Sequence, residues 1–225
     1  MSFERDNKKN IKQMLECAEN ERKGLGFPYI IVSYRDWDSI IHDRDIFTLA
    51  ERKIIKGILS SSSTKRILDI GCGQGKAVEE LKIKYPHIEC HGIDIAFRDN
   101  FSQTEKEIYL NIMDAHNLEF PDNYFDMVFS AFSFMYFTDK LKCIKEAHRV
   151  LIPNGRGYLH LGHEWFDPPG KAIIPRSSEN SDVFWDGRYR KVMIDKRGEG
   201  TSCLDIEYKS FSHDEMSCYS YTSTS

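Results

Sequence analysis

Short apolar runs alternate with stretches of helical periodicity through the middle of the chain. The apolar runs predict five strands, at Arg66 to Ile70, Glu89 to Ile93, Ile108 to Ile112, Phe125 to Ser130 and Tyr158 to Leu161. Helical spacing predicts helices over residues 5–23, about 40–59, 74–84 and 139–151. Because strands and helices alternate, we expect a three-layer α/β fold with a doubly wound, mostly parallel sheet. Ligands of such sheets bind at the carboxyl ends of the strands.

A glycine-rich turn follows the first strand. Gly71, Gly73 and Gly75 occupy every second position, and they leave room for a ligand beside the turn and the start of the next helix. This pattern predicts a nucleotide-like cofactor. A dinucleotide fingerprint has its third glycine three positions after the second, where this chain has Lys76, so a nicotinamide dehydrogenase is disfavoured.

Asp69 and the three glycines fill the pattern D-x-G-x-G-x-G, and here the chain resembles the class I S-adenosylmethionine-dependent methyltransferases. The resemblance covers about residues 64–163. It implies a Rossmann-like sheet and S-adenosyl-L-methionine as the methyl donor. Asp69, Gly71, Gly73 and Gly75 are then the first donor-binding residues.

Further donor-site candidates follow the next three strands. Asp94 ends the second strand, where an acidic side chain in this architecture can accept both hydroxyls of a ribose. The resemblance implies that Asp114 meets the adenine amino group, that the N–H of Ala115 meets a ring nitrogen, and that the backbone at Ser130 faces the methionine part. Taken singly, Asp94 and Asp114 are also explained as turn caps.

Candidate catalytic groups follow the fifth strand. His163 lies near the sheet edge where the methyl group would be presented, and it is the preferred general base, although histidines at strand ends are more often structural. A metal site built from His160, His163 and Glu164 is disfavoured because neighbours on a strand point to opposite faces. The catalytic candidate is therefore His163, with no metal expected.

The acceptor is less well marked than the donor. The turn after the fifth strand resembles that of small-molecule methyltransferases of the ubiquinone-biosynthesis type, which implies a small-molecule acceptor. The run Asp167, Pro168, Pro169 imitates a signature of nitrogen methylation, but it continues into Gly170 where that signature has an aromatic residue. We therefore do not expect amide or adenine nitrogen as the acceptor.

Net charge and cysteine pattern indicate which classes of acceptor are disfavoured and in which cellular compartment the protein is expected. The chain has 225 residues and a formal net charge of −4, which disfavours nucleic acid and leaves protein side chains as the next acceptor class. Its six cysteines form no Cys-x-x-Cys pair and are expected to be reduced thiols. With neither an N-terminal apolar segment nor an apolar run long enough to span a bilayer, we expect a cytoplasmic protein.

The expected organisation is a helical cap over 1–63, a donor-binding core over 64–163, and an acceptor-side loop, hairpin and polar tail over 164–225. Tyr189 to Ile194 and Leu204 to Tyr208 predict the antiparallel hairpin. This hairpin either closes a seven-stranded sheet or precedes a helix, starting at Ser212 to Met216, and two final strands that the chain lacks. The second alternative is favoured.

A competing interpretation is a non-catalytic module that binds the donor or a partner protein. It is motivated by the lack of an obvious base and by the incomplete C-terminal sheet that the favoured alternative implies.

Overall fold

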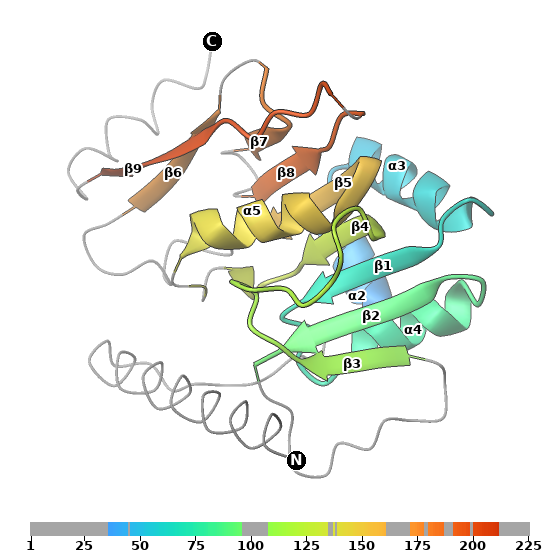
Figure 1. The fold of residues 1–225 in the computed structure, drawn as a ribbon. Helices are drawn as coiled ribbons and strands as arrows, with labels where there is room; N and C mark the ends of the chain where they lie inside the picture. Colours follow the sequence, from blue (N-terminus) through green and yellow to red (C-terminus); the bar gives the residue numbers. More distant parts are fainter. Residues whose placement is uncertain are drawn as a thin grey trace, which may run out of the picture.

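The computed structural model describes residues 36–44, 46–95, 108–134, 137, 139–160, 172–177, 180–186, 191–198 and 200–211. Its centre is a seven-stranded sheet in the order β3-β2-β1-β4-β5-β8-β7 (Figure 1). The strands of this sheet are β1 (Arg66–Ile70), β2 (Glu89–Asp94), β3 (Ile108–Ile112), β4 (Phe125–Ser130), β5 (Leu151–His160), β7 (Val183–Asp186) and β8 (Lys191–Asp195). The expected α/β, mostly parallel fold is confirmed.

Strands β1 to β5 form a parallel block, as their alternation with helices predicts. β1 pairs with β2 and β4, β2 with β3, and β4 with β5, all in parallel. β5 begins at Leu151, earlier than the expected start at Tyr158. Within it Asn154 has a φ of 68°, and the register with β4 shifts between Phe125 and Met127, so the first part of this strand is irregular.

The C-terminal strands pair differently from the sequence prediction. β8 lies antiparallel between β5 and β7, so β7 and β8 form the hairpin that closes the seven-stranded sheet. The expectation that the final strands are missing is therefore wrong. The alternation in residues 204–208 belongs to β9 (Ile206–Phe211), which pairs with β6 (Ala172–Ser177) in a separate two-stranded sheet and not with residues 189–194.

Four described helices surround the sheet: α2 (Trp37–His42), α3 (Leu49–Ser60), α4 (Lys76–Lys84) and α5 (Lys140–Val150). The helix expected near 40–59 is divided because Thr48 starts a new one. Its hydroxyl accepts from the Glu51 N–H while Glu51 reaches back to the Thr48 N–H, which is a capping box. The helices expected at 5–23 and from 212 lie outside the described residues.

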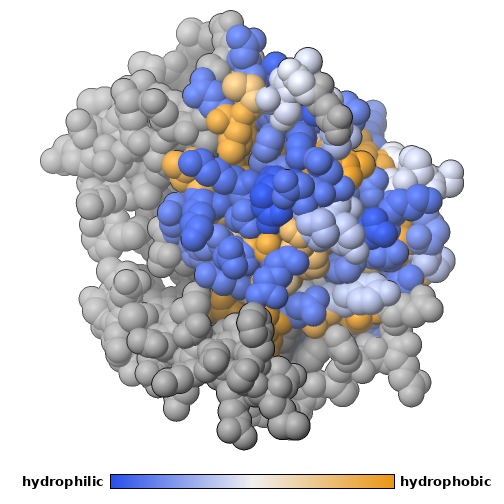
Figure 2. Space-filling view, in the orientation of Figure 1, coloured by the Kyte–Doolittle hydropathy of each residue, from blue (hydrophilic) through white to orange (hydrophobic). Residues whose placement is uncertain are grey.

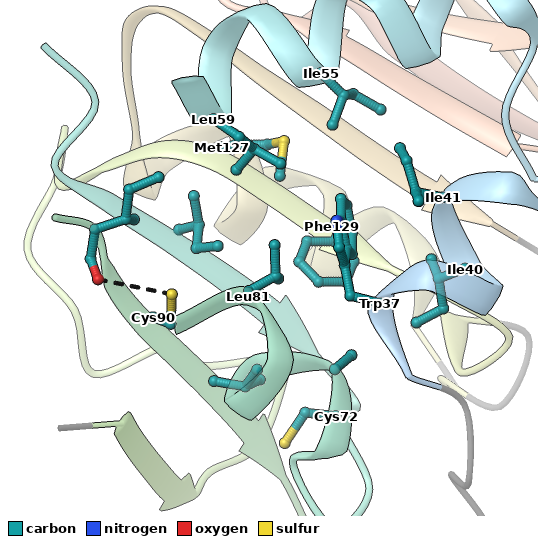
Figure 3. Packing of buried hydrophobic residues seen from close by; sticks show 14 of the residues in the cluster. Trp37, Ile40, Ile41, Ile55, Leu59, Cys72, Leu81, Cys90, Met127 and Phe129 are labelled. Atoms are coloured by element: carbon teal, nitrogen blue, oxygen red, sulfur yellow. Dashed lines mark hydrogen bonds between the residues drawn. The ribbon is translucent and has the colours of Figure 1, made fainter. Parts of the chain in front are cut away.

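Two apolar cores lie on the two faces of the sheet. One packs α2, α3 and α4 against the strands, with Trp37 and Phe129 in edge-to-face contact at 5.3 Å (Figure 3). The other packs α5 against alternate strand residues such as Leu68 and Val128. Burial on both faces explains why the strands read as continuous apolar runs.

Lys196, which follows β8, binds the C-terminal end of helix α5. The buried ammonium of Lys196 donates to the carbonyls of Leu151 at 2.7 Å and His148 at 3.0 Å, and to the side-chain oxygen of Asn123 at 2.8 Å. A cation at a helix C-terminus satisfies carbonyls that lack partners within the helix.

The face that carries α5 is mostly hydrophilic, with separate hydrophobic patches (Figure 2). Among the described residues, no helix is long and apolar enough to cross a membrane.

Candidate functional site

The carboxyl ends of β1 to β4 bring the predicted donor-site residues to one edge of the sheet. Ile70 lies beside Ile93, Asp94 beside Ile112, and Asp69 beside Phe129 in the parallel registers. The glycine turn, Asp94, Asp114 and Ser130 therefore follow neighbouring strands at the same edge. Asp69, Asp94 and Asp114 thus all lie toward the same edge of the sheet.

The glycine turn takes a backbone conformation that other residues rarely adopt. Gly71, Gly73 and Gly75 have φ values of 75°, 59° and 77°. A Cβ at Gly71 would lie 2.4 Å from the side chain of Ser133, and one at Gly75 would lie 2.4 Å from Leu110. Both a left-handed φ and close neighbours thus require glycine.

The amides of this turn bond mainly to the neighbouring strand. Gly71 and Cys72 donate to the carbonyl of Ile93 at 2.8 and 2.9 Å, and Gly73 donates to the Asp94 carboxylate at 2.8 Å. Amides that are used in this way do not form a pyrophosphate cradle. The bonding agrees with the spacing argument against a dinucleotide.

Asp94 is held in place by the backbone on both of its oxygens. Oδ2 accepts from Gly73 and Oδ1 accepts from Ile95, each at 2.8 Å. Each carboxylate oxygen has a second lone pair, so a fixed Asp94 can still accept hydrogen bonds from a vicinal diol.

Asp69 is buried behind the turn, with 4% of its surface exposed. Burial, and to a smaller extent the charge of Asp94, raises the pKa of Asp69 well above its ordinary value. An acidic group in this state can become charged when a cation binds nearby.

Asp114 and Ala115 follow β3 in a tight turn. Asp114 accepts from the backbone N–H of His116 at 2.9 Å and contacts its ring Nδ1 at 2.6 Å. Burial acts to raise the pKa of Asp114, but the hydrogen bonds from His116 prevail and lower it. Ala115 is buried against the core on the α5 side. Asp114 is thus an ionised acceptor at this edge.

The segment after β4 crosses over the glycine turn. The Ser133 hydroxyl donates to the Ile70 carbonyl at 2.8 Å, so the hydroxyl of Ser130, at 2.7 Å, donates to Ser133. Phe132 between them has a φ of 59°, an uncommon conformation for an aromatic residue. This chain of hydroxyls joins the ends of β4 and β1.

The acceptor side is only partly described. His163, Glu164 and residues 167–170 lie outside the described residues. His160 ends β5 in a buried position, and its ring meets Phe132 edge to face at 4.8 Å. Phe129 and Phe134, which lie at and after the end of β4, are buried core residues.

Sequence reasoning missed His116 and Ser133. Their signals are weak, because a histidine two positions after an acid and two serines three positions apart are common. Only the fold shows that His116 contacts Asp114 and that Ser133 covers Gly71.

A serine, histidine and aspartate also meet away from this edge, at the end of α5. His148 Nε2 lies 2.8 Å from Asp182 Oδ2 and 3.1 Å from the Ser202 hydroxyl, and Ser202 also donates to Asp182. A hydrolytic triad needs the acid on one ring nitrogen and the serine on the other. Both groups contact Nε2 here, so the cluster is a structural link.

A sheet in this strand order, with a glycine turn after β1 and acids after β2 and β3, has the Rossmann-like arrangement of the class I S-adenosylmethionine-dependent methyltransferases. Comparison with known proteins agrees with this class. Residues 68–159 match the family described as methyltransferase domain.

Similar proteins carry methyltransferase names. A demethylmenaquinone methyltransferase of Thermotoga maritima is 33% identical over 107 residues, 47% of this chain and 47% of that protein. A malonyl-(acyl-carrier protein) O-methyltransferase of Geobacter sulfurreducens is 32% identical over 124 residues, 50% of this chain and 46% of that protein. The 27-O-demethylrifamycin SV methyltransferase of Amycolatopsis mediterranei is 28% identical over 174 residues, 72% of this chain and 61% of that protein. The chain spans about half the length of the first two.

Proposed function

We propose that this protein transfers a methyl group from S-adenosylmethionine to a small-molecule acceptor. The observation that supports the proposal is the bond between the Gly73 amide and the Asp94 carboxylate, which holds this acid beside the glycine turn, where ribose hydroxyls would bind. The donor supplies a methyl group already activated by its sulfonium. The protein then has to bind the donor, align the acceptor and exclude water.

Each predicted donor-site residue has a proposed role. Asp94 accepts the ribose hydroxyls, and Asp114 with the N–H of Ala115 meets the adenine. Asp69 would lie on the cationic side of the donor. Because burial raises its pKa, Asp69 would be ionised only when the positive charge of the donor is nearby. A further set of residues supplies the surface around the methionine part: Gly71, Gly73, Gly75 and Ser130.

A small-molecule acceptor is supported by the names of similar proteins, which are methyltransferases of demethylmenaquinone, malonyl-(acyl-carrier protein) and 27-O-demethylrifamycin SV. The net charge of −4 does not favour a nucleic-acid acceptor, and protein side chains are the next class. We also propose a cytoplasmic location, because the described cysteines Cys72, Cys90, Cys143 and Cys203 are free thiols. Residues 1–63 would act as a cap, 64–163 as the donor-binding core and 164–225 as the acceptor side.

Calorimetric titration with S-adenosyl-L-homocysteine tests the donor site. We expect Asp94→Ala to weaken binding by about 1 to 3 kcal/mol, since it removes the partner of the ribose hydroxyls. NAD should not compete. Unchanged affinity in a folded Asp94→Ala variant would exclude Asp94 from the site, and no binding by the natural chain would overturn the proposed function.

His163 is the proposed general base, on the ground that it follows the end of β5 at the acceptor side. If so, His163→Ala lowers turnover with labelled donor by about 100-fold or more and leaves donor affinity within about twofold. The measurement is a methyl-transfer assay across an acceptor panel, with donor titration as its control. Equal turnover in the variant would remove His163 from the mechanism.

A further inference from the structure

His116 joins two parts of the molecule that the sequence keeps apart. Its ring Nδ1 contacts Asp114 Oδ1 at 2.6 Å, and its Nε2 accepts from the backbone N–H of Asp139 at 3.0 Å. Asp114 follows β3, whereas Asp139 is the N-cap of α5 and accepts from Lys142. Only 16% of the His116 side-chain surface is exposed.

These two contacts fix the protonation of the ring. A backbone amide can only donate, so Nε2 must be the unprotonated nitrogen and Nδ1 must carry the proton. The Nδ1–H then points to Asp114, and the backbone N–H of His116 donates to the same oxygen. One oxygen of Asp114 is therefore occupied by two donors of a single residue, which fixes the direction of the carboxylate.

The segment before Asp139 also lies near the glycine turn. Phe137 in this segment is close to both His116 and Gly71: its ring centroid is 6.2 Å from that of His116, and its Cζ would be 3.7 Å from a Cβ at Gly71. The N–H of Phe137 donates to Phe134, which places it in the turn leading to α5. His116 thus contacts both the acid after β3 and the segment that covers the turn after β1.

We propose that His116 is the positioning residue for adenine recognition: its Nδ1–H holds Asp114 toward the 6-amino group of the base, and its Nε2 ties this acid to the start of α5. The inference rests on the proposed donor site. It assigns a role to a residue that touches Asp114 and is not required to touch the donor.

A donor analogue with a changed base isolates this role. S-Adenosyl-L-homocysteine presents an amino group to Asp114, whereas S-inosyl-L-homocysteine presents a carbonyl oxygen that a carboxylate repels. The ratio of the two dissociation constants measures recognition of the amino group. Because both constants come from the same protein sample, a general loss of folded protein does not change the ratio.

We expect the natural chain to prefer the adenosyl compound, and His116→Phe to reduce that preference by about tenfold. His116→Asn and His116→Gln then separate the two bonds. Asn carries an amide N–H near the position of Nδ1 and should retain most of the preference. Gln carries an oxygen near the position of Nε2 and should lose the preference while keeping the bond to Asp139.

The matched control is His87→Gln, which changes an exposed histidine whose ring contacts the Ser61 carbonyl. Its preference should equal that of the natural chain. An unchanged preference in His116→Phe, or equal losses in the Asn and Gln variants, would overturn the positioning role even though the donor binds. Failure of the natural chain to bind either compound would instead count against the proposed function.

Discussion

At the scale of single residues, His91 shows what burial does to an ionisable group. Its ring stacks on Tyr109 at 4.7 Å and meets Phe120 and Phe125 edge to face. Neither ring nitrogen has a hydrogen bond within the described residues, and Glu89 lies 3.8 Å away. Burial lowers the pKa of His91 to about 4, although Glu89 acts in the opposite direction.

This depressed pKa predicts a loss of stability in mild acid. In the unfolded chain a histidine takes up its proton near pH 6.5, but in the folded chain His91 stays neutral until about pH 4. The unfolded state therefore binds more protons in this window, and the free energy of unfolding falls as the pH drops from 6.5 to 4, by about 2 to 3 kcal/mol.

His91→Phe should flatten this part of the stability profile, as measured by urea unfolding at several pH values. His87→Phe is the matched control, because it changes an exposed histidine and should leave the slope as it is. A His91→Phe profile as steep as that of the natural chain would show that other groups cause the loss.

At the scale of elements, a buried ion pair joins α3 to β8. Lys191 is fully buried, and its ammonium lies 2.5 Å from Glu51 Oε2 and donates to the Ile46 carbonyl at 3.0 Å. The same carboxylate oxygen accepts from the backbone and hydroxyl of Thr48. Glu51 thus caps its own helix and holds the strand that lies between β5 and β7.

Removing one partner of this pair leaves a charge buried without its counterion. We expect Lys191→Met to lower the free energy of unfolding by about 3 to 5 kcal/mol. The double variant Glu51→Gln with Lys191→Met should recover part of this loss. Chemical denaturation is the measurement.

Lys84→Met provides the comparison for this ion pair, because it breaks a pair with Asp38 whose side chains are 44% and 53% exposed. Such surface pairs contribute about 0 to 1 kcal/mol. If the Lys191 and Lys84 variants lost equal stability, the buried pair would have no special role in joining α3 to β8.

The sequence predicts elements that have a local pattern, and it does not predict contacts between distant segments. Five strands and the glycine turn were predicted because buried parallel strands and left-handed turns have local signatures. The partner of β9 was not, since alternation in residues 204–208 shows which face is buried and says nothing about which strand lies beside it. The roles of His116 and Ser133 likewise depend on contacts between segments distant in the chain, with Asp139 and with Ile70.

At the scale of the whole molecule, the proposed donor would contact loops after β1, β2, β3 and β4 at once. A ligand that binds only the folded chain raises its stability by RT ln(1 + [L]/Kd), about 2.7 kcal/mol at 100 times Kd. For a chain of 225 residues we expect S-adenosyl-L-homocysteine at that concentration to raise the melting temperature by about 5 to 10 °C.

Differential scanning fluorimetry measures this shift, and Asp94→Ala at the same ligand concentration should reduce it. NAD at equal concentration serves as the control ligand and should have no effect. A rise in melting temperature with NAD and none with S-adenosyl-L-homocysteine would favour a dehydrogenase-like site.

The contacts of Lys196 with the C-terminal end of α5 show that the end of the family match is not the end of the folded unit. The match to the methyltransferase domain family ends at residue 159, but the ammonium that binds the carbonyls of His148 and Leu151 comes from residue 196. A fragment cut where the resemblance stops would keep every proposed donor contact and lose the fastening of one of its own helices. The segment that matches the family is therefore shorter than the segment whose contacts hold α5 in place.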